Sequence, residues 1–580
     1  MLRPLSGSRK IKPFAVYDLE TTVDLQNVYL VGWYDGKVYK YWESKPLPPS
    51  HPTSCVTAFL KWIFERPSKL SHYAHNGGNF DAVFLLSSII ANFPALKAEI
   101  IPSQSSILML KAKSGGNEWT FLDSARSLPD SLDNLASCFL NERKTEIHDY
   151  SKLHLDAQRY EYLRRDCVLL YGVLSRYFTL LYDKLGGKAG ISAASTALAT
   201  YRTNYQRHIL PDISEKAASL ARAGYYGGRC EPFRREFKGP GILHCYDVNS
   251  LYPWAMRQHM PVEEIHVKGY HPELCGFVDA TVSVRNVRVP ILPCRAEKRL
   301  LFPTGKWRGV FSTAELRMAE KHKQLSSLSF HRAVYFNTAP IFVDFVDRLY
   351  IFRDKSKKDW DLSLDRVAKI SMNSLYGKFG SQEARETIHI RPTFDDMVDR
   401  QMQQMPSPLT NIECFIERTE VHTDYMLPQI SAWVTALGRC RLVEGLLEEK
   451  IDPYYCDTDS IYTEAVLQTG SSLGEWKDEY AYDPIVYAYF LAPKVYVLRH
   501  NSGKVTNKAK GFSKFGEKLP PDAIAILAAG KSLEVSRFAK ARSVIAGDFG
   551  LMVSQKKCYL QYEKRIFHKD GSSDPRRVSL

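Results

Sequence analysis

The sequence lacks the features that would place it among secreted, membrane-spanning or zinc-binding proteins. Its eleven cysteines include no CxxC pair and no spacing with histidine that is typical of a metal site, so we expect buried thiols in a reducing compartment. The start, Met1 to Lys12, is basic and lacks the apolar run of a signal peptide. No apolar stretch approaches the ~20 residues of a membrane span. The longest candidate, Ala82 to Phe93, is predicted to be a core helix.

The sequence also contains no internal repeat and no low-complexity tract. A hydrophobic content of 44% with 12% aromatic residues is ample for packed cores, which excludes a disordered chain. A length of 580 residues predicts more than one domain. The net charge of +14 is a weak indication of a polyanionic partner.

The stretch from Tyr454 to Thr463 contains two aspartates at the tip of a predicted β-hairpin. Asp457 and Asp459 lie two residues apart, and such residues share a face of an extended segment, here with no positive side chain between them. Two carboxylates this close repel each other unless a cation lies between them, and oxygen ligands at a rigid turn suit Mg²⁺ or Mn²⁺. An aspartate-rich surface turn would explain the same residues, so other parts of the chain must decide.

A second group of carboxylates is predicted in the first 190 residues. A short strand pattern that begins at Phe14 runs into Asp18 and Glu20, which again lie two residues apart on one face. After a glycine turn, Asp81 lies in the first turn of an apolar helix. The helix dipole is a sufficient structural reason for an acid at that position.

The third piece of this group is a helical pattern from about Leu155 to Leu185. Tyr162 and Asp166 are four residues apart and share a face of that helix. Carboxylates that arrive from separate elements can hold two divalent metals, and a phenol or a metal-bound water can then orient the attack on a phosphodiester. A tyrosine and an aspartate at that spacing are also common by chance, so the order of the motifs along the chain has to decide.

Two glycine and aromatic motifs follow in the second half. The run from Ala223 to Arg229 contains Tyr225 beside Gly227 and Gly228. Glycines let a nucleic-acid backbone approach closely and tyrosines can stack on bases, although an ordinary turn would explain the run equally well. A predicted strand then ends at Asp247.

A polar stripe is predicted on a helix from Arg366 to Phe379. Lys369, Asn373 and Tyr376 occupy positions i, i+4 and i+7, so they lie on one face. A cation, an amide and an aromatic ring suit the phosphate, sugar and base of a nucleotide. A solvated helix face would show the same residues.

Taken in order, these motifs resemble motifs A, B and C of family B DNA polymerases, preceded by a DEDD-type 3′–5′ exonuclease of the variant with a tyrosine. The chain is most similar to the small protein-primed branch found in phages and linear plasmids, of tectivirus-like type, over about residues 14 to 515. The runs that carry this resemblance are Tyr73 to Gly78, Lys144 to Ile147, Tyr225 to Gly228, Tyr455 to Ser460 and Lys494 to Tyr496. The spacing between motifs B and C is long for the smallest members, and the last 65 residues match only in their basic character.

The resemblance implies a role for each matching residue. The exonuclease set comprises the acids Asp18, Glu20, Asp81 and Asp166, the water-orienting Tyr162, the assisting Lys144, and the DNA-binding Asn76 and Phe80. The implied metal ligands are Asp18, Glu20 and Asp166 in the first site and Asp247, Val248 and Asp459 in the second, with Asp457 close by. The nucleotide-binding set comprises Lys369, Asn373, Arg353, the stacking Tyr376, and Tyr252 as a barrier to a 2′-hydroxyl. The remaining DNA-binding set comprises Tyr225, Gly227, Gly228, Lys494 and Tyr496.

The implied fold class is α/β, with a ribonuclease-H-like 3′–5′ exonuclease domain followed by a right-hand polymerase domain. The expected segments are the exonuclease (1–190), the palm start (191–260), a β-rich insertion (261–340), the fingers (341–380), a second insertion (381–425), the palm with motif C (426–515) and the thumb (516–580). The two insertions are candidate terminal-protein regions. In the family such insertions help to dock the priming protein and to close a ring around DNA.

The implied partners are a DNA primer-template, dNTPs, two Mg²⁺ or Mn²⁺ ions per active site and a terminal priming protein. We expect a monomer that is encoded by a virus or plasmid, acts in the cytoplasm of the host cell and does not contact a membrane. Two alternatives stay open: a nucleic-acid-primed family B polymerase, and a non-catalytic DNA-binding protein on the same fold. Loss of any carboxylate from the two sites would favour the second, and all are present. The lysine-rich run from Lys504 to Lys518 is predicted to contact duplex DNA or to be a solvated loop.

Overall fold

The fold is described by a computed structural model of the chain. The residues it describes are 1–6, 11–22, 27–44, 54–67, 69–103, 106–147, 149, 152–297, 299–381, 384–405, 414–420, 425–448, 451–510, 523–529, 531–540, 551–558 and 564–579. Among these residues no helix combines the length and the apolar character that a membrane crossing requires.

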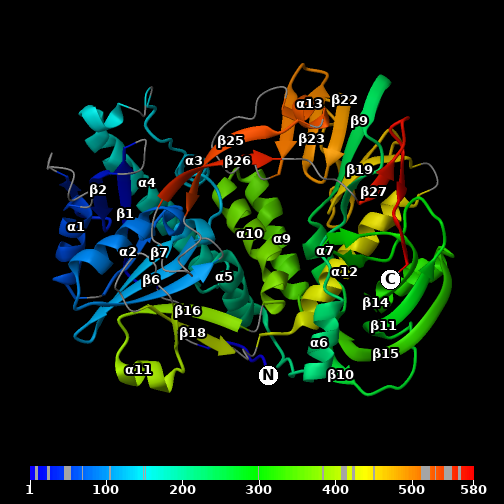
Figure 1. Cartoon of the computed structure of the whole chain (residues 1–580), viewed down its shortest axis with the longest axis horizontal. Helices are drawn as coiled ribbons and strands as arrows, with labels where there is room; N and C mark the ends of the chain where they lie inside the picture. Colours follow the sequence, from blue (N-terminus) through cyan, green and yellow to red (C-terminus); the bar gives the residue numbers. More distant parts are fainter. Residues whose placement is uncertain are drawn as a thin grey trace.

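The N-terminal half is built on a ten-stranded mixed sheet (Figure 1). Its strands, in spatial order, are β17 (Gln403–Met405), β18 (Cys414–Glu420), β16 (Ala384–Ile390), β5 (Lys97–Ser103), β6 (Ser106–Ser114), β7 (Asn117–Asp123), β4 (Ser71–Ala74), β1 (Phe14–Thr21), β2 (Val28–Tyr34) and β3 (Tyr39–Glu43). β4 runs parallel to β1 and β7, and the other pairs are antiparallel.

Helices cover both faces of this sheet. The helices are α1 (Ser54–Phe64) and α2 (Asp81–Asn92) on one face, and α3 (Leu132–Leu140) and α4 (Gln158–Thr179) on the other. The odd-numbered buried residues of β1 share a core with α1 and α2, whereas the even-numbered ones pack with α4. Because side chains alternate along a strand, Asp18 and Glu20 emerge on the α4 face.

The segment predicted as a second insertion adds strands to the edge of the same sheet. β16 pairs with β5 through Ile388 opposite Ile100, and β18 pairs with β16 in turn. Ile388, Ile390 and Cys414 are buried in the core that α1 and α2 cover. α11 (Phe394–Asp399) lies between β16 and β17 in the chain. Residues far apart in the sequence therefore complete one sheet.

The C-terminal half contains two larger sheets. The first has the order β24 (Val505–Ala509), β23 (Val495–His500), β22 (Ile485–Ala492), β9 (Glu236–Val248), β20 (Ser460–Thr463), β19 (Pro453–Asp457) and β8 (Cys230–Pro232), with β21 (Trp476–Asp478) beside β9. The second has the order β10 (Met260–Ile265), β15 (Leu325–Ala339), β11 (Cys275–Val284), β14 (Thr304–Ser312) and β29 (Arg577–Ser579). Buried residues of α7 (Leu251–Met256) and α12 (Pro428–Leu446) share a core with β9, β19 and β20.

A pair of helices, α9 (Val343–Lys358) and α10 (Leu362–Phe379), lies between the two halves (Figure 1). They pack on α5 (Ala193–Thr200) and on the π-helical turn η5 (Tyr201–Tyr205). One continuous core includes buried residues of α4, η5, α9, α10 and α12. The other elements are α6 (Glu215–Ala223), α8 (Thr313–Lys321), α13 (Ala523–Ala528), β12 (Cys294–Ala296), β13 (Arg299–Leu301), β25 (Leu533–Lys540), β26 (Leu551–Cys558), β27 (Arg565–Phe567) and β28 (Ser573–Pro575).

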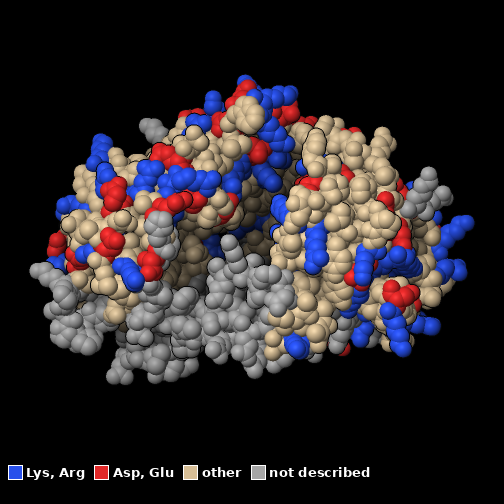
Figure 2. All heavy atoms as spheres, turned by 90° about the horizontal axis from the view of Figure 1, so that it is seen from above, with Lys and Arg blue, Asp and Glu red and all other residues tan. Residues whose placement is uncertain are grey.

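Between its two halves the molecule is hollowed, and Lys and Arg side chains gather along the rim of the hollow (Figure 2). Positive charge along this rim would suit an extended polyanion.

Most of the elements expected from the sequence are confirmed. The hairpin at Tyr454 to Thr463 corresponds to β19 and β20, and the Arg366 to Phe379 helix to α10. α5 continues into η5, and this helical segment ends at Tyr205. Of the lysine-rich run, residues up to 510 are described and lie in or beside β24, whereas 511–518 lie outside the described residues. Of the predicted thumb, residues 516–522, 530, 541–550, 559–563 and 580 also lie outside them.

Candidate active sites

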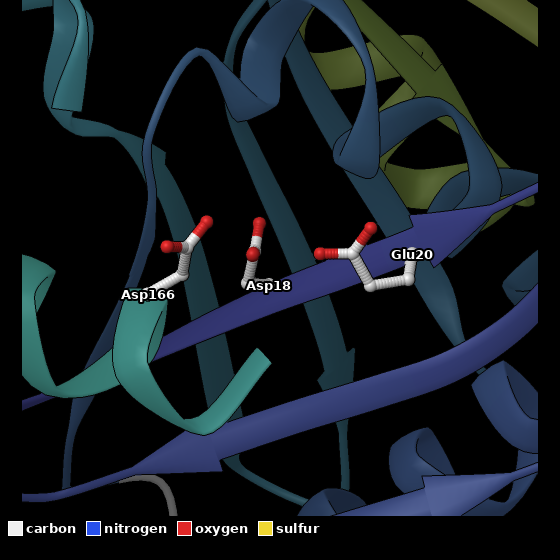
Figure 3. Close-up of side chains that lie close together, drawn as sticks. All are labelled: Asp18, Glu20 and Asp166. Carbon is white, nitrogen blue, oxygen red and sulfur yellow. The ribbon is translucent and has the colours of Figure 1, made fainter. Parts of the chain in front are cut away.

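The first candidate site joins a strand and a helix of the N-terminal half. Asp18 and Glu20 on β1 and Asp166 on α4 each offer a carboxylate oxygen, and these atoms lie within 4.8 Å of one another (Figure 3). A register shift follows Glu20 in the pairing with β2, and such bulges are common beside active sites. Oxygen ligands at this spacing fit a divalent cation. The structure therefore brings together Asp18, Glu20 and Asp166, which the sequence analysis placed in one group.

Burial and mutual repulsion act on all three of these carboxyl groups. Burial, followed by the charge of Glu20, raises the pKa of Asp18 well above its ordinary value. Burial and then Asp166 raise the pKa of Glu20 to about 8. Burial also raises the pKa of Asp166, although Lys144 opposes that shift. A bound cation would relieve this repulsion.

Lys144 supplies positive charge to the same site. Its Nζ forms an ion pair with Asp166 and lies 4.9 Å from the ring centroid of the buried Tyr162. Burial alone would lower the pKa of Lys144, but the carboxylates of Asp166, Asp18 and Glu20 raise it. The Lys144 backbone N–H donates to Asp133 Oδ1 at 2.9 Å, which ties the lysine to α3.

Two further acids lie behind the cluster. Asp81, at the start of α2, accepts a hydrogen bond from the backbone N–H of Leu19 at 3.2 Å, so it is joined to β1 beside the two ligands. Burial is the main cause that raises its pKa to about 7, and Asp123 adds to the shift. Asp123 at the end of β7 is buried, and its Oδ2 accepts no hydrogen bond among the described residues. Sequence reasoning missed Asp123, whose signal is an acid at a strand end parallel to β4.

A pocket of about 490 Å³ opens at this cluster. It is lined by Asp18, His75, Asn76, Ala125, Pro129, Asp130, Ser131, Leu132, Lys144 and Asp166. Asn76 is exposed with a φ of 61°, and Phe80 packs edge-on against Phe84 with ring centroids 5.3 Å apart. The structure thus places Asn76 on the pocket wall, and Phe80 lies close by in the chain at the start of α2.

The second candidate site lies in the C-terminal half, where β9 meets the β19–β20 hairpin. Asp247 at the end of β9 stands opposite Ser460, and the Val248 N–H donates to the carbonyl of Asp459 at 2.8 Å. Burial and then the charge of Asp459 raise the pKa of Asp247 to about 7. Burial and then Asp457 raise the pKa of Asp459 to about 6. The register therefore brings together acids that are more than 200 residues apart.

Glu479 is a further acid of this site that sequence reasoning missed. Its charge contributes to the raised pKa of both Asp247 and Asp459, after larger contributions from burial and the neighbouring aspartates. Its backbone N–H donates to the carbonyl of Cys245 at 2.9 Å, which fixes it beside β9. The only signal in the sequence is an acidic pair next to a short strand.

Lys494 corrects one expectation from the sequence. Its Nζ lies 2.6 Å and 2.8 Å from the two carboxylate oxygens of Asp457, although the hairpin sequence suggested no positive partner for the aspartates. The lysine comes from the turn between β22 and β23, so the hairpin alone could not reveal it. Tyr496 is only 9% exposed and packs against Tyr455 and Phe490, with ring centroids 5.4 Å and 5.8 Å away.

The glycine motif packs against the turn of the hairpin. A Cβ on Gly228 would lie 2.8 Å from the side chain of Thr458, so a larger residue does not fit there. The Thr458 N–H donates to the carbonyl of Arg229 at 2.6 Å, which holds Thr458 at a φ of 63°. Gly227 faces open space, and Tyr225 is partly buried.

The polar stripe of α10 faces the same site. Lys369 and Asn373 are exposed, and the charge of Lys369 opposes the rise in the pKa of Asp247. The rings of Tyr252 and Tyr376 lie 4.6 Å apart between centroids. A cation, an amide and two rings therefore converge near the acids.

Arg353 is held by other groups of the chain. Its Nε donates to Asp365 at 2.8 Å and its Nη1 donates to Ser250 Oγ at 3.1 Å. Ser250 follows Asp247 by three residues in the chain, so this contact holds Arg353 near the second candidate site.

Unusual backbone conformations gather at both sites. Asn76, Thr458 and Lys494 are among the described non-glycine residues with positive φ and lie in predicted motifs, and Ser250, which also has a positive φ, follows Asp247 by three residues. Backbone strain of this kind is often retained where a functional geometry requires it.

Comparisons with known proteins agree with this arrangement. The family model for DNA polymerase type B, organellar and viral, matches residues 141–426. The DNA-directed DNA polymerase of Enterobacteria phage PRD1 is 26% identical over 547 residues, which covers 90% of each chain. Probable DNA polymerases of the fungi Ascobolus immersus and Neurospora intermedia are each 26% identical, over 84% and 81% of this chain. The chain spans only 45% and 55% of the length of these two fungal relatives.

Solved structures show the same fold. The structure of phi29 DNA polymerase complexed with primer-template DNA and incoming nucleotide substrates has a TM-score of 0.71 with this chain, at 18% identity. The match covers 95% of this chain and 100% of that one, so the expected combination of exonuclease and right-hand polymerase domains is confirmed as the fold. In its motifs, in its fold and over residues 141–426, the chain is thus similar to the type B DNA polymerases of organellar and viral type.

Proposed function

We propose that this chain is a DNA-directed DNA polymerase with a 3′–5′ exonuclease. The observation that carries the proposal is the presence of two separate carboxylate sites in one fold, each assembled from elements distant in the sequence. The similarity to the phage PRD1 polymerase over 90% of each chain supports it. A non-catalytic protein would gain nothing from two sets of acids whose members repel one another within each set.

In the polymerase site, Asp247, Val248 and Asp459 would hold two Mg²⁺ or Mn²⁺ ions. Such ions, when bound, neutralise the charge on a transferring phosphoryl group and activate the primer hydroxyl. Lys369 and Asn373 would bind the triphosphate of the incoming nucleotide from the exposed face of α10. The protein contributes positioning and charge, as is usual for phosphoryl transfer.

The tyrosine pair would select the sugar and stack on the base. Tyr376 lies on α10 and Tyr252 on α7, with their rings in contact. Tyr252 would block a 2′-hydroxyl, and Tyr376 would pack against the nascent pair. Lys494 and Tyr496 would steady the primer end. The engaged guanidinium of Arg353 would hold Ser250 and α10 in place as well as reach toward phosphate.

In the exonuclease site, Asp18, Glu20 and Asp166 would hold the metals and Asp81 would complete the acid set. Lys144 would compensate their charge, and the phenol of Tyr162 would orient the attacking water. Asn76 and Phe80 would bind the single strand at the pocket. We propose that the two sites share one strand end, which is extended in the second site and trimmed in the first.

The direct test uses the whole chain, a primed template with a 5′-labelled primer, and Mg²⁺. With dNTPs we expect a longer primer, and without them a shorter one. A chelator should stop both reactions. A chain that neither extends nor degrades the primer would contradict the proposed function.

We also propose protein priming and strand displacement, in a virus- or plasmid-type protein that works as a monomer in the host cytoplasm. The support is the resemblance of the motifs to that branch, together with the second insertion, whose strands β16 and β18 extend the edge of the N-terminal sheet (Figure 1). A basic tunnel that admits one strand could open a duplex, because nucleotide addition supplies free energy comparable to the ~1.4 kcal/mol mean stacking of a base step.

The test of this role replaces residues 392–413 by a short glycine-rich turn. Ile390 and Cys414 stand opposite each other, so the β16–β18 pairing is kept. We expect gap filling to survive and synthesis through duplex to stop. Equal synthesis on a gapped template and through duplex would contradict the strand-opening role. Failure to attach a dNMP to any cognate protein hydroxyl would contradict protein priming and favour a nucleic-acid primer.

A further inference from the structure

One wall of the pocket at the exonuclease cluster is tied to α10 by an ion pair. Asp130 lines the pocket just before α3. Its Oδ2 forms an ion pair with Arg366, which lies on α10 and is 236 residues away in the chain. The two side chains are 26% and 29% exposed, so the pair is partly shielded from water.

Asp130 is also bonded to the rest of the pocket. Its Oδ1 accepts hydrogen bonds from the Ser131 N–H at 2.7 Å and from Asn134 Nδ2 at 2.9 Å. Its backbone carbonyl lies 2.6 Å from Nε2 of His75, the residue before Asn76. Burial opposes ionisation of Asp130, but the hydrogen bonds from Asn134, Ser131 and Arg366 hold its pKa below the ordinary value. The carboxylate is therefore charged at neutral pH.

We propose that Arg366 is a positioning residue of the exonuclease site, which neutralises Asp130 so that a polyanionic strand can enter the pocket. The pocket already contains Asp18 and Asp166, and a further unpaired carboxylate on its wall would repel phosphate. Metal ligands can be compensated by bound cations, whereas Asp130 has the arginine instead. The exonuclease site is thus completed by a residue from another part of the fold.

The neighbouring residue on α10 connects the same helix to the polymerase site. Asp365 pairs with Arg353, which donates to Ser250 next to motif A. Consecutive residues of one helix therefore reach both sites. A displacement of α10 would change the charge on the exonuclease pocket and the contacts at motif A together.

The inference rests on the proposed exonuclease, and the experiment separates the two. We would measure kcat and KM for degradation of a 5′-labelled single-stranded oligodeoxynucleotide with Mg²⁺. The variants are Arg366→Gln, Arg366→Lys, Asp130→Asn and the double variant Asp130→Asn with Arg366→Gln. Arg176→Gln is the matched control, because Arg176 on α4 pairs at 3.0 Å with Asp361 at the start of α10, and Asp361, unlike Asp130, does not line the pocket.

Arg366→Gln should raise KM about three- to ten-fold and leave kcat within about two-fold, with a smaller effect at high salt. Arg366→Lys and the double variant should both keep KM near that of the unmodified chain, because neither leaves an unpaired carboxylate. An unchanged KM in Arg366→Gln would overturn the inference, as would an equal rise in Arg176→Gln or in the double variant. Absence of degradation by the unmodified chain would overturn the proposed function itself.

Discussion

The two carboxylate sites differ in how they are held. In the N-terminal half, Asp18, Glu20 and Asp166 lie within 4.8 Å, and Lys144 approaches from the loop after α3. In the C-terminal half, backbone register sets the positions: Asp247 stands opposite Ser460, and Val248 bonds to the turn. Among the described residues, only the first set forms a cluster of three acids at metal-binding distance.

In each site, one lysine nevertheless forms an ion pair with one of the acids. Lys144 pairs with Asp166 and Lys494 pairs with Asp457. Lys144 is 27% exposed and lies beside Tyr162, whereas Lys494 is 50% exposed. The lysine of the first site is therefore more shielded from water than the lysine of the second.

The largest effect should come from removing acids from one site at a time. Asp459→Asn should lower primer extension by at least about 10³-fold and spare 3′ degradation. The reason is that the variant loses a proposed ligand of the metal ions that stabilise the transferred phosphoryl group. Asp18→Asn with Glu20→Gln should do the reverse. Both rates are measured on one labelled primer. Glu464→Gln, on the same hairpin but exposed, is the control that should keep both activities. Loss of both activities in each folded variant would mean that one shared site had been taken for two.

The two lysines should separate the sites more gently. Lys144→Ala should lower 3′ degradation about 10- to 100-fold, as is common when a partner of a metal ligand is removed. Lys494→Ala should lower extension, because Asp457 and Asp459 would then repel each other without a cation. Each variant serves as the control of the other in paired assays. If Lys144→Ala weakened extension as strongly as degradation, the comparison between the two lysines would fail.

The tyrosine pair tests selectivity within one site. Tyr252→Val should improve ribonucleotide use relative to dNTP use about ten-fold or more, because the ring that would meet a 2′-hydroxyl is removed. The measurement is the ratio of kcat/KM for each rNTP and its dNTP. Tyr376→Val removes the ring in contact with Tyr252 and should weaken both nucleotides together. An unchanged ratio in Tyr252→Val would show that another group excludes the ribose.

Local sequence patterns were enough to predict much of the fold and most of the acids. Alternation on β1 gave Asp18 and Glu20, helical spacing gave Tyr162 and Asp166, and the hairpin gave Asp457 and Asp459. These signals lie within a few residues of each other, so period and turn chemistry reveal them. The resemblance to the polymerase family explained why these motifs occur in this order.

Long-range contacts could not be predicted in this way. Lys494, Glu479 and Asp123 reach the sites from neighbouring strands whose register is set by tertiary pairing. The same applies to the ion pair between Asp130 and Arg366. Likewise, nothing near Ile388 shows that its strand joins β5, because β5 lies almost 290 residues earlier. Such positions need a folded structure.

The last comparison between the halves concerns their response to acid. His72 on β4 is 3% exposed, and Trp33 Nε1 donates to its Nδ1 at 3.3 Å. Burial lowers the pKa of His72 to about 4. Burial also lowers the pKa of His75. In the C-terminal half, the hydrogen bond between His271 and Glu273 instead raises the pKa of His271.

A histidine whose pKa is lower in the folded chain than in the unfolded chain destabilises the fold at low pH, because protons then bind more readily to the unfolded chain. The stabilising contribution of neutral His72 is complete above about pH 6.5 and is lost as the pH falls toward 4, a difference of about 3 kcal/mol. Hydrogen exchange at pH 7 and pH 5 should therefore show protection falling on β1, β4 and β7 more than on β9, β19 and β20. His72→Gln should flatten this pH dependence at some cost in stability at pH 7. Equal loss of protection in both halves, or an unchanged slope in the variant, would place the acid sensitivity elsewhere.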